Sequence, residues 1–455
     1  MYVLNLIRKT HWVVYVAATT LIIAVLLLRN HLLRGTGGIL LLPDQDAFLQ
    51  LTTARSMAFY HTWGLDRHFE SASPSILYPL ILTIPFFIFG AHLIVVPIVN
   101  IIAAFVLLNA LQKWLSSYAV PNVVQLCILL SVIFLPALPL MILYGMENIF
   151  LFLFGFLFTS RLLKEWSNAV FTRAIFVYAA LLVATRYDAF LLILAPCLVL
   201  MLRRRYTPAL ELLIWGLLPV LVFGFLSLKK GSYFLPNIYL VQPERLSWQY
   251  DWFIGLVVAV VYPLLNSWRQ ARNYRAIRWL GIFLAVVLLT RDVYAFRQSD
   301  RSNLQLYRRQ YQISKFLHRY YHRYGILSDD MPLTSYFAEA RYIDLSGIGS
   351  VTIARGRLDS LPQHVLLKQI LEKENVHIAV LTDQYQSQLP EEWIKTGSWE
   401  MAAFDTMRKK SYYFYSRDSS QADQLKKNLV EYASLLPPDI SVRYYYTRPP
   451  KLPSE

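Results

Sequence analysis

Cysteine and charged residues are scarce in this chain of 455 residues, as are Asp and Glu inside its apolar runs. Its two cysteines, Cys127 and Cys197, both lie inside apolar runs. The polar C-terminal part therefore offers neither a disulfide nor a thiolate metal site. Acidic residues deep in the apolar runs are nearly absent, which weakens an ion-coupled transporter interpretation. The sequence also has no glycine-rich phosphate loop, no nucleophile-elbow motif and no internal repeat.

Apolar residues, in contrast, make up 56% of the chain and give it a mean hydropathy of +0.39. Apolar runs recur from Trp12 to about Val293 and then stop; they lie near 12–28, 76–90, 93–111, 123–143, 149–163, 172–185, 188–202, 209–228, 252–266 and 279–293. Because backbone groups in lipid must be hydrogen-bonded internally, these runs should be helices. The fold class expected is an all-α polytopic membrane bundle, with about nine to eleven membrane helices, and a small α/β C-terminal domain.

The expected domains are a transmembrane domain over residues 1–293, a basic juxtamembrane helix over 294–324 and a soluble α/β domain over 325–455. Several apolar runs have only about 15 residues, short of the roughly 20 that a perpendicular span needs, which favours broken helices.

Pro136 and Pro139 predict a kink in the run at 123–143. In the tail, Val376–Leu381 and Tyr412–Tyr415 are typical of strands.

The formal net charge of +15 does not require nucleic acid, because basic cytoplasmic loops and contact with anionic lipids account for it. Arg203–Arg205 and Arg269–Arg278 are predicted to be cytoplasmic loops. Arg8 and Lys9 precede an uncleaved signal anchor, which places the following loop outside. The basic residues of 297–323 favour a cytoplasmic position, which conflicts with an external C-terminal domain. The conflict disappears if this stretch is a helix that lies on lipid phosphates.

Asp44 and Asp46 stand in that first external loop, two residues apart. In an extended loop they would point the same way. One of them could take a proton from an acceptor hydroxyl, and the two together could hold a divalent cation on a phosphate. A divalent cation is the single cofactor that the sequence suggests. Two solvated loop acids are the simpler alternative.

Glu147 lies between strongly apolar runs, where an acid is costly and marks a candidate site. It could also be an interfacial acid that ends a helix. Arg186 and Asp188 are likewise flanked by apolar residues. They could form a structural ion pair, or the guanidinium of Arg186 could hold a phosphate oxygen.

Lys229 and Lys230 follow the eighth apolar run, with Tyr233 and Asn237 close behind. Two lysines and aromatic residues near a membrane surface suit a lipid-linked phosphate. An ordinary aromatic belt with snorkelling lysines is the alternative. His318 and His322 have i, i+4 spacing, but arginines surround them and no acid is adjacent, so we expect no metal there.

Six short elements occur in a characteristic order along the chain. They are Asp46-Ala47-Phe48 with Ala54-Arg55, Glu70 to Leu77, Gly145-Met146-Glu147-Asn148, Arg186-Tyr187-Asp188-Ala189, Leu235 to Gln242 and Tyr342 to Ile348. Their order resembles the GT-C class of integral-membrane glycosyltransferases, and within it bacterial proteins related to the terminal arabinofuranosyltransferase of mycobacterial cell walls. Gln45 falls on the first acid of that family's acidic pair, so which of Asp44 and Asp46 acts as base stays open.

This resemblance implies a membrane bundle of the GT-C type and an inverting glycosyltransferase in the bacterial inner membrane, with its active site and C-terminal domain on the extracytoplasmic side. The implied partners are a polyprenyl-phosphate-linked sugar donor, membrane lipids, and a glycan, lipid or protein acceptor. Asp46 or Asp44 would be the base. The implied substrate-binding residues are Glu70, Glu147, Arg186, Asp188, Lys229, Lys230, Tyr233 and Asn237. The competing hypotheses are a non-enzymatic transporter or lipid-carrier flippase, and a scaffold protein.

Overall fold

The computed structural model describes residues 2–135, 137–166, 171–241, 294–322, 324–330, 332–338, 340–359, 367–368, 370–372, 374, 376–401 and 411–446. The apolar runs predicted at 252–266 and 279–293, and the basic loop Arg269–Arg278, lie outside these residues. The chain divides into two compact units. The helical unit contains Met1–Gln50, Pro74–Leu226 and Glu244–Asn303, and the sheet unit contains Leu51–Ser73, Ser227–Pro243 and Leu304–Glu455.

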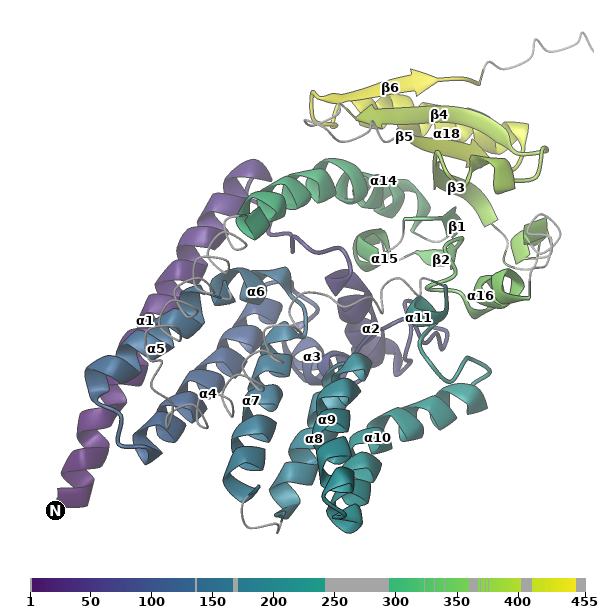
Figure 1. Ribbon diagram of the computed structural model, residues 1–455. Helices are drawn as coiled ribbons and strands as arrows, with labels where there is room; N and C mark the ends of the chain where they lie inside the picture. The colour runs from purple at the N-terminus through teal and green to yellow at the C-terminus, as the bar shows by residue number, and fades with distance from the viewer. Residues whose placement is uncertain are drawn as a thin grey trace, which may run out of the picture. The chain divides into compact units, whose positions relative to one another are not determined.

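The helical unit is built from the apolar runs, and each predicted run between residues 12 and 228 forms helix (Figure 1). Helix α2 (Ala47–Tyr60) begins in this unit, and its later residues belong to the sheet unit. The other helices are α1 (Tyr2–Gly35), α3 (Leu77–Phe89), α4 (Val95–Ser117), α5 (Asn122–Phe134), α6 (Leu138–Tyr144), α7 (Asn148–Glu165), α8 (Arg173–Thr185), α9 (Phe190–Leu202) and α10 (Tyr206–Lys229).

Three helices within the described residues are long and apolar enough to cross a bilayer: Trp12–Gly35, Val95–Ser117 and Tyr206–Lys229. Helices α5 and α6 make a fourth span if the two are counted as one. They are bent by 41° relative to each other, as the kink expected in this run requires. The chain is therefore a multi-pass membrane protein. Helices α3, α8 and α9 are apolar but shorter.

Packing in the helical unit joins helices that are neighbours along the chain and helices that are far apart in it. Helix α7 packs against both α4 and α8, and α1 packs against α4, α5 and α6. The core between α7, α8, α9 and α10 is apolar and contains Phe158, Leu182, Ile193, Cys197 and Leu212, all nearly inaccessible. Many outward side chains on these helices are large and apolar as well, as a helix facing lipid requires.

The sheet unit contains a mixed six-stranded sheet in the order β2-β1-β3-β5-β4-β6. Strands β1, β2 and β3 are parallel, and the other pairings are antiparallel. Strands β3 and β5 confirm the two strands predicted from sequence. The strands are β1 (Gly325–Ser328), β2 (Arg341–Asp344), β3 (Val376–Thr382), β4 (Ile394–Met401), β5 (Ser411–Ser416) and β6 (Ile440–Tyr444).

Helices cover both faces of this sheet, which is why its central strands are buried on both sides. One face packs on α14 (Gln312–Tyr321) and α18 (Ser419–Ala433), and the other packs on α16 (Val351–Leu358). Trp399 anchors the first face, because its ring stacks on Tyr432 at 5.8 Å and meets the edge of Phe316 at 5.5 Å. The shorter helices of this unit are α11 (Asn237–Val241) and α15 (Pro332–Ala338).

The basic stretch before β1 is part of this packing. Helix α14 buries Ile313, Phe316 and Leu317 in the core of the sheet unit. On its polar side Arg319 pairs with Glu431 at 3.0 Å, and in the preceding π-helical turn Arg308 pairs with Asp439 at 2.7 Å. The apolar face of α14 thus packs against protein, and two of the arginines have acidic partners in the same unit.

Candidate functional site

The predicted acid pair lies in a turn that starts helix α2. Asp44 accepts a hydrogen bond on Oδ1 from the backbone N–H of Asp46, at 2.9 Å. The first helical bonds follow, since the N–H of Phe48 donates to the carbonyl of Gln45 and that of Leu49 to the carbonyl of Asp46. Both carboxylates are half-buried. An aspartate side chain that accepts a hydrogen bond from the backbone N–H two residues later forms an Asx turn. Such a turn commonly precedes a helix.

Glu147 lies at the junction between α6 and α7 and is 1% exposed. Helix α6 ends at Tyr144 and is capped by Gly145, whose φ of 73° favours glycine, and an added Cβ at Gly145 would collide with a methyl carbon of Leu42. Helix α7 then begins, with the N–H of Leu151 bonded to the carbonyl of Glu147 at 3.0 Å. The Glu147 side chain accepts a hydrogen bond from the amide of Gln50.

Gln50 follows Asp46 by one helical turn, so the two positions share a side of α2. Its amide nitrogen also lies 3.7 Å from the sulfur of Met146. These contacts join the turn that carries the acid pair to the α6–α7 junction. Gln50 is not among the residues predicted from sequence, although it is the single amide in the run Ala47 to Leu51.

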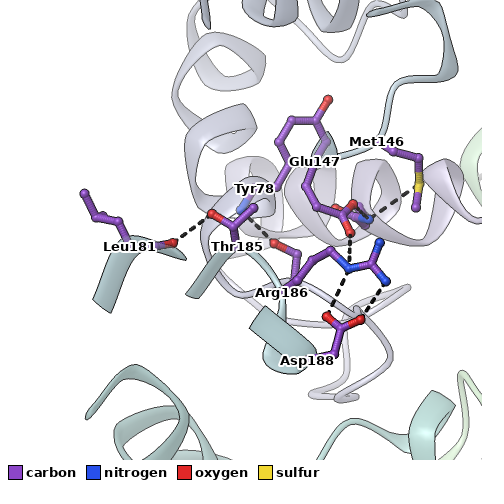
Figure 2. Close-up of polar contacts among 9 residues, drawn as sticks. Tyr78, Met146, Glu147, Leu181, Thr185, Arg186 and Asp188 are labelled. Atoms are coloured by element: carbon purple, nitrogen blue, oxygen red, sulfur yellow. Dashed lines mark hydrogen bonds and ion pairs between the residues drawn. The ribbon is translucent and has the colours of Figure 1, made fainter. Parts of the chain in front are cut away.

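Arg186 and Asp188 form the ion pair that the sequence left as one of two possibilities. Helix α8 ends at Thr185, Arg186 adopts an extended conformation, and a 3-10 turn over Tyr187–Ala189 returns Asp188 beside it. Arg186 donates from Nε to Oδ1 at 3.1 Å and from Nη2 to Oδ2 at 3.0 Å. Its Nε also lies 3.8 Å from Oε1 of Glu147. Figure 2 shows the guanidinium facing both carboxylates.

This arrangement engages the guanidinium fork with protein carboxylates. A bidentate pair is directional and strong, and a phosphate would compete with Asp188 for the same edge of Arg186. The geometry therefore suits a positioning role for Arg186: it holds Glu147, which holds Gln50 and the first turn of α2. Asp44, Asp46, Glu147, Arg186 and Asp188 all belong to the helical unit.

The other five predicted residues belong to the sheet unit. Glu70 is partly buried and accepts a hydrogen bond from the N–H of Val351, at 2.8 Å, where α16 begins. Burial raises the pKa of Glu70 to about 8; the bond from Val351 opposes this shift, while the carboxylates of Asp66 and Asp344 add to it. Near neutral pH this side chain is largely a neutral acid.

Asn237 begins α11 and is fully buried. Its side-chain amide donates to the carbonyl of Ile348 at 3.2 Å, and its backbone N–H donates to the carbonyl of Ser71 at 2.7 Å. Lys229 ends α10 and is exposed, as is Lys230, while Tyr233 is half-buried. Asn237 thus holds the segment after the lysines against residues of its own unit.

Arg55 is a buried cation that the sequence marks only as part of the Ala54-Arg55 element. It donates to the carbonyls of Tyr336 and Ser335, the second at 3.1 Å, and its guanidinium carbon lies 5.4 Å from the Tyr336 ring centroid. These contacts fix α2 residues to α15 inside the sheet unit. Over the described residues, no group of three or more His, Cys, Asp or Glu side chains is arranged to hold a metal ion. The divalent cation suggested by the sequence stays a prediction.

Comparison with known proteins gives one match. A family model described as a domain of unknown function, DUF8728, covers residues 301–415, about a quarter of the chain and almost entirely within the sheet unit. No curated protein and no solved structure matches the chain. The fold thus defines a multi-pass membrane protein whose C-terminal α/β domain contains this segment.

Proposed function

We propose that the protein is an inverting glycosyltransferase of the GT-C type, which moves one monosaccharide from a polyprenyl-phosphate carrier to an envelope glycan, lipid or protein. The observation that carries the proposal is the half-buried pair Asp44 and Asp46 at the first turn of α2, anchored through Gln50 to the buried network of Glu147, Arg186 and Asp188. The motif resemblance supplies the reaction class.

The reaction needs one base and one leaving group. The carboxylate of Asp46 or Asp44 takes the proton of an acceptor hydroxyl as its oxygen forms a bond to the anomeric carbon. The bond from that carbon to the carrier phosphate breaks on the opposite face, so the configuration inverts and polyprenyl phosphate leaves with the electron pair. A carboxylate fixed by a turn and a supporting network is oriented for this step.

The remaining residues receive roles that fit their contacts. Glu147, Arg186 and Asp188 position the first turn of α2. The exposed ammonium groups of Lys229 and Lys230 attract the carrier phosphate, with Tyr233 beside them, and Asn237 holds their segment. The substrate-binding role of Glu70 stays a prediction, because its carboxyl group accepts a hydrogen bond from Val351 within the sheet unit. A divalent cation on the phosphate is compatible with the acid pair. The site and the C-terminal domain are assigned to the extracytoplasmic side of the bacterial inner membrane.

The transporter alternative would place its working charges within the membrane spans. The position of Glu147 at a helix junction, paired with Arg186 and Asp188 at the end of α8, supports the transferase instead. An impermeant thiol reagent applied to a cysteine introduced at the C-terminus tests the assigned side, because labelling of intact cells requires an extracytoplasmic tail.

The function is tested by incubating membranes that contain the protein with a panel of polyprenyl-phosphate sugars and reading the product by mass. The variant Asp44→Asn with Asp46→Asn should abolish transfer and leave the amount of folded protein unchanged. Asp66→Asn is the matched control, because Asp66 bonds the backbone N–H of His68 two residues on, in the same way as Asp44 bonds that of Asp46. Full activity in the double variant rejects the mechanism.

A further inference from the structure

The sheet unit contains a cavity that the proposed transfer reaction does not use. Its volume is about 570 Å³, and it is open to solvent. Helices α11 and α16 lie side by side (Figure 1), and both contribute residues to the lining, as does the turn after β3. The lining residues that matter for its chemistry are Leu240, Val241, Arg357, Gln384, Tyr385 and Gln388.

The cavity lies at the carboxyl ends of the parallel strands. Arg357 donates from Nη2 to the carbonyl of Leu345, the residue after β2, at 2.8 Å. Tyr385 lies in the turn after β3, and its backbone N–H donates to the carbonyl of Thr382, the last residue of that strand, at 3.2 Å. Strand β1 lies between β2 and β3. In open α/β sheets this edge is where ligands bind, because the loops after adjacent strands diverge there.

Two buried polar atoms of the lining side chains have no hydrogen-bond partner among the described residues: Nε of Arg357 and Oε1 of Gln388. Nε of Arg357 is a hydrogen-bond donor on a cation and needs an acceptor. Oε1 of Gln388 is an acceptor and needs a donor. The guanidinium carbon of Arg357 lies 5.4 Å from the Tyr385 ring centroid, and the backbone N–H of Gln388 donates to the Tyr385 carbonyl at 3.1 Å. Tyr385 therefore contacts the Arg357 side chain and fixes the backbone at Gln388.

The buried acid Asp344 interacts electrostatically with Arg357, and its oxygens already have donors. They accept hydrogen bonds from the N–H and hydroxyl of Ser346 and from the N–H of Gly349. Burial raises the pKa of Asp344, although these hydrogen bonds and Arg357 oppose the shift. The oxygens of Asp344 are thus engaged by backbone and hydroxyl donors, which leaves the cation of Arg357 available to an anion in the cavity.

We propose that this cavity binds a small anion that also carries hydroxyl groups, a sugar acid or a sugar phosphate. The anion takes the guanidinium edge at Nε of Arg357, for which planar carboxylate and phosphate oxygens suit. A hydroxyl of the same molecule donates to Oε1 of Gln388. The volume falls in the range of small-molecule sites, and Leu240 and Val241 supply the apolar wall that such sites have. This site is independent of the transfer reaction proposed above.

The experiment measures equilibrium binding of glucuronic acid, glucose 6-phosphate and glucose to the full-length protein in detergent, by calorimetry. We expect both anions, or one of them, to bind saturably, and glucose to bind at least about tenfold more weakly because it lacks the charge. The tighter anion identifies the source of the charge. Arg357→Gln should weaken anion binding by at least about tenfold.

Since Arg357 also bonds the Leu345 carbonyl, a second variant guards against misfolding. Gln388→Met keeps the side-chain volume, removes the acceptor, and should weaken anion binding severalfold. Gln421→Met is the matched control, because Oε1 of Gln421 is also buried without a partner among the described atoms but does not line the cavity. It should bind with wild-type affinity. No saturable anion binding by the wild-type protein, equal binding of glucose, or wild-type affinity in both cavity variants would overturn the proposal.

Discussion

Gln50 and Glu147, 97 positions apart in the chain, are joined by a side-chain hydrogen bond in which neither residue is appreciably exposed. The bond connects the turn of Asp44 and Asp46 to a network in which one guanidinium serves two carboxylates. Each member of such a buried network depends on the others, because removing one partner leaves a charge without compensation. Perturbing the network should therefore affect both folding and the geometry of the acid pair.

Arg186→Met tests the network. We expect a loss of roughly 3–5 kcal/mol in the free energy of unfolding, because Glu147 and Asp188 would be left without their cation. Thermal unfolding in detergent measures it, and adding Asp188→Asn should restore part of the loss. The control is Arg319→Met, which breaks a half-exposed pair with Glu431 and should cost no more than about 1 kcal/mol. Equal losses in the two arginine variants would contradict the network's importance.

Single substitutions of the acid pair separate the base from its neighbour. Asn at position 44 keeps an oxygen for the N–H of Asp46, so Asp44→Asn preserves the turn, and Asp46→Asn removes the other charge. Loss of the general base should lower the transfer rate by about 10²- to 10⁴-fold, whereas the other variant should lose far less. Initial rates at saturating donor, read by product mass, distinguish them. Similar small losses in both single variants would show that neither acid alone is the base.

Glu70 should make the sheet unit sensitive to pH. Its pKa rises from an ordinary 4.5 to about 8 on folding, so the folded state prefers the neutral acid. The contribution to stability is fully present below about pH 4.5 and is lost as the pH rises through about 8. Its size is at most a few kcal/mol, at about 1.4 kcal/mol per pKa unit, because Glu70 is only partly buried.

Glu70→Gln keeps an acceptor for the N–H of Val351 and removes the titration. Its free energy of unfolding should fall less than that of wild type between pH 5 and pH 8, as measured by urea unfolding followed through tryptophan fluorescence. Glu431→Gln is the control, since Glu431 is half-exposed in its pair with Arg319. A Glu70→Gln profile parallel to that of wild type would disprove the assignment.

Arg55→Lys should weaken the sheet unit by roughly 1–3 kcal/mol, because lysine cannot reach the carbonyls of Tyr336 and Ser335 with one planar fork. Limited proteolysis of the full-length protein measures the change as faster cleavage within residues 304–446. Arg67→Lys provides the comparison: Arg67 is exposed over the Tyr60 ring, where lysine makes the same kind of contact. Equal protection of the Arg55 and Arg67 variants would count against a structural role for Arg55.

The helices and the closest pairs of site residues could be predicted from sequence because both depend on short-range chemistry. A run such as 209–228 must form a helix in lipid whatever surrounds it, and α10 spans it. Arg186 and Asp188 meet because a two-residue offset at a helix end brings them together. Strands β3 and β5 were likewise visible in their apolar and aromatic residues.

Residues far apart in sequence met only through the tertiary structure. No local pattern pairs Gln50 with Glu147, Glu70 with Val351, or Arg357 with Gln388. The same holds for α14, whose basic sequence suggested a helix lying on lipid but whose apolar face packs into the sheet unit. The hydrophobic pattern of a segment determines which of its faces is buried. The element that packs against this face depends on the packing of the whole unit.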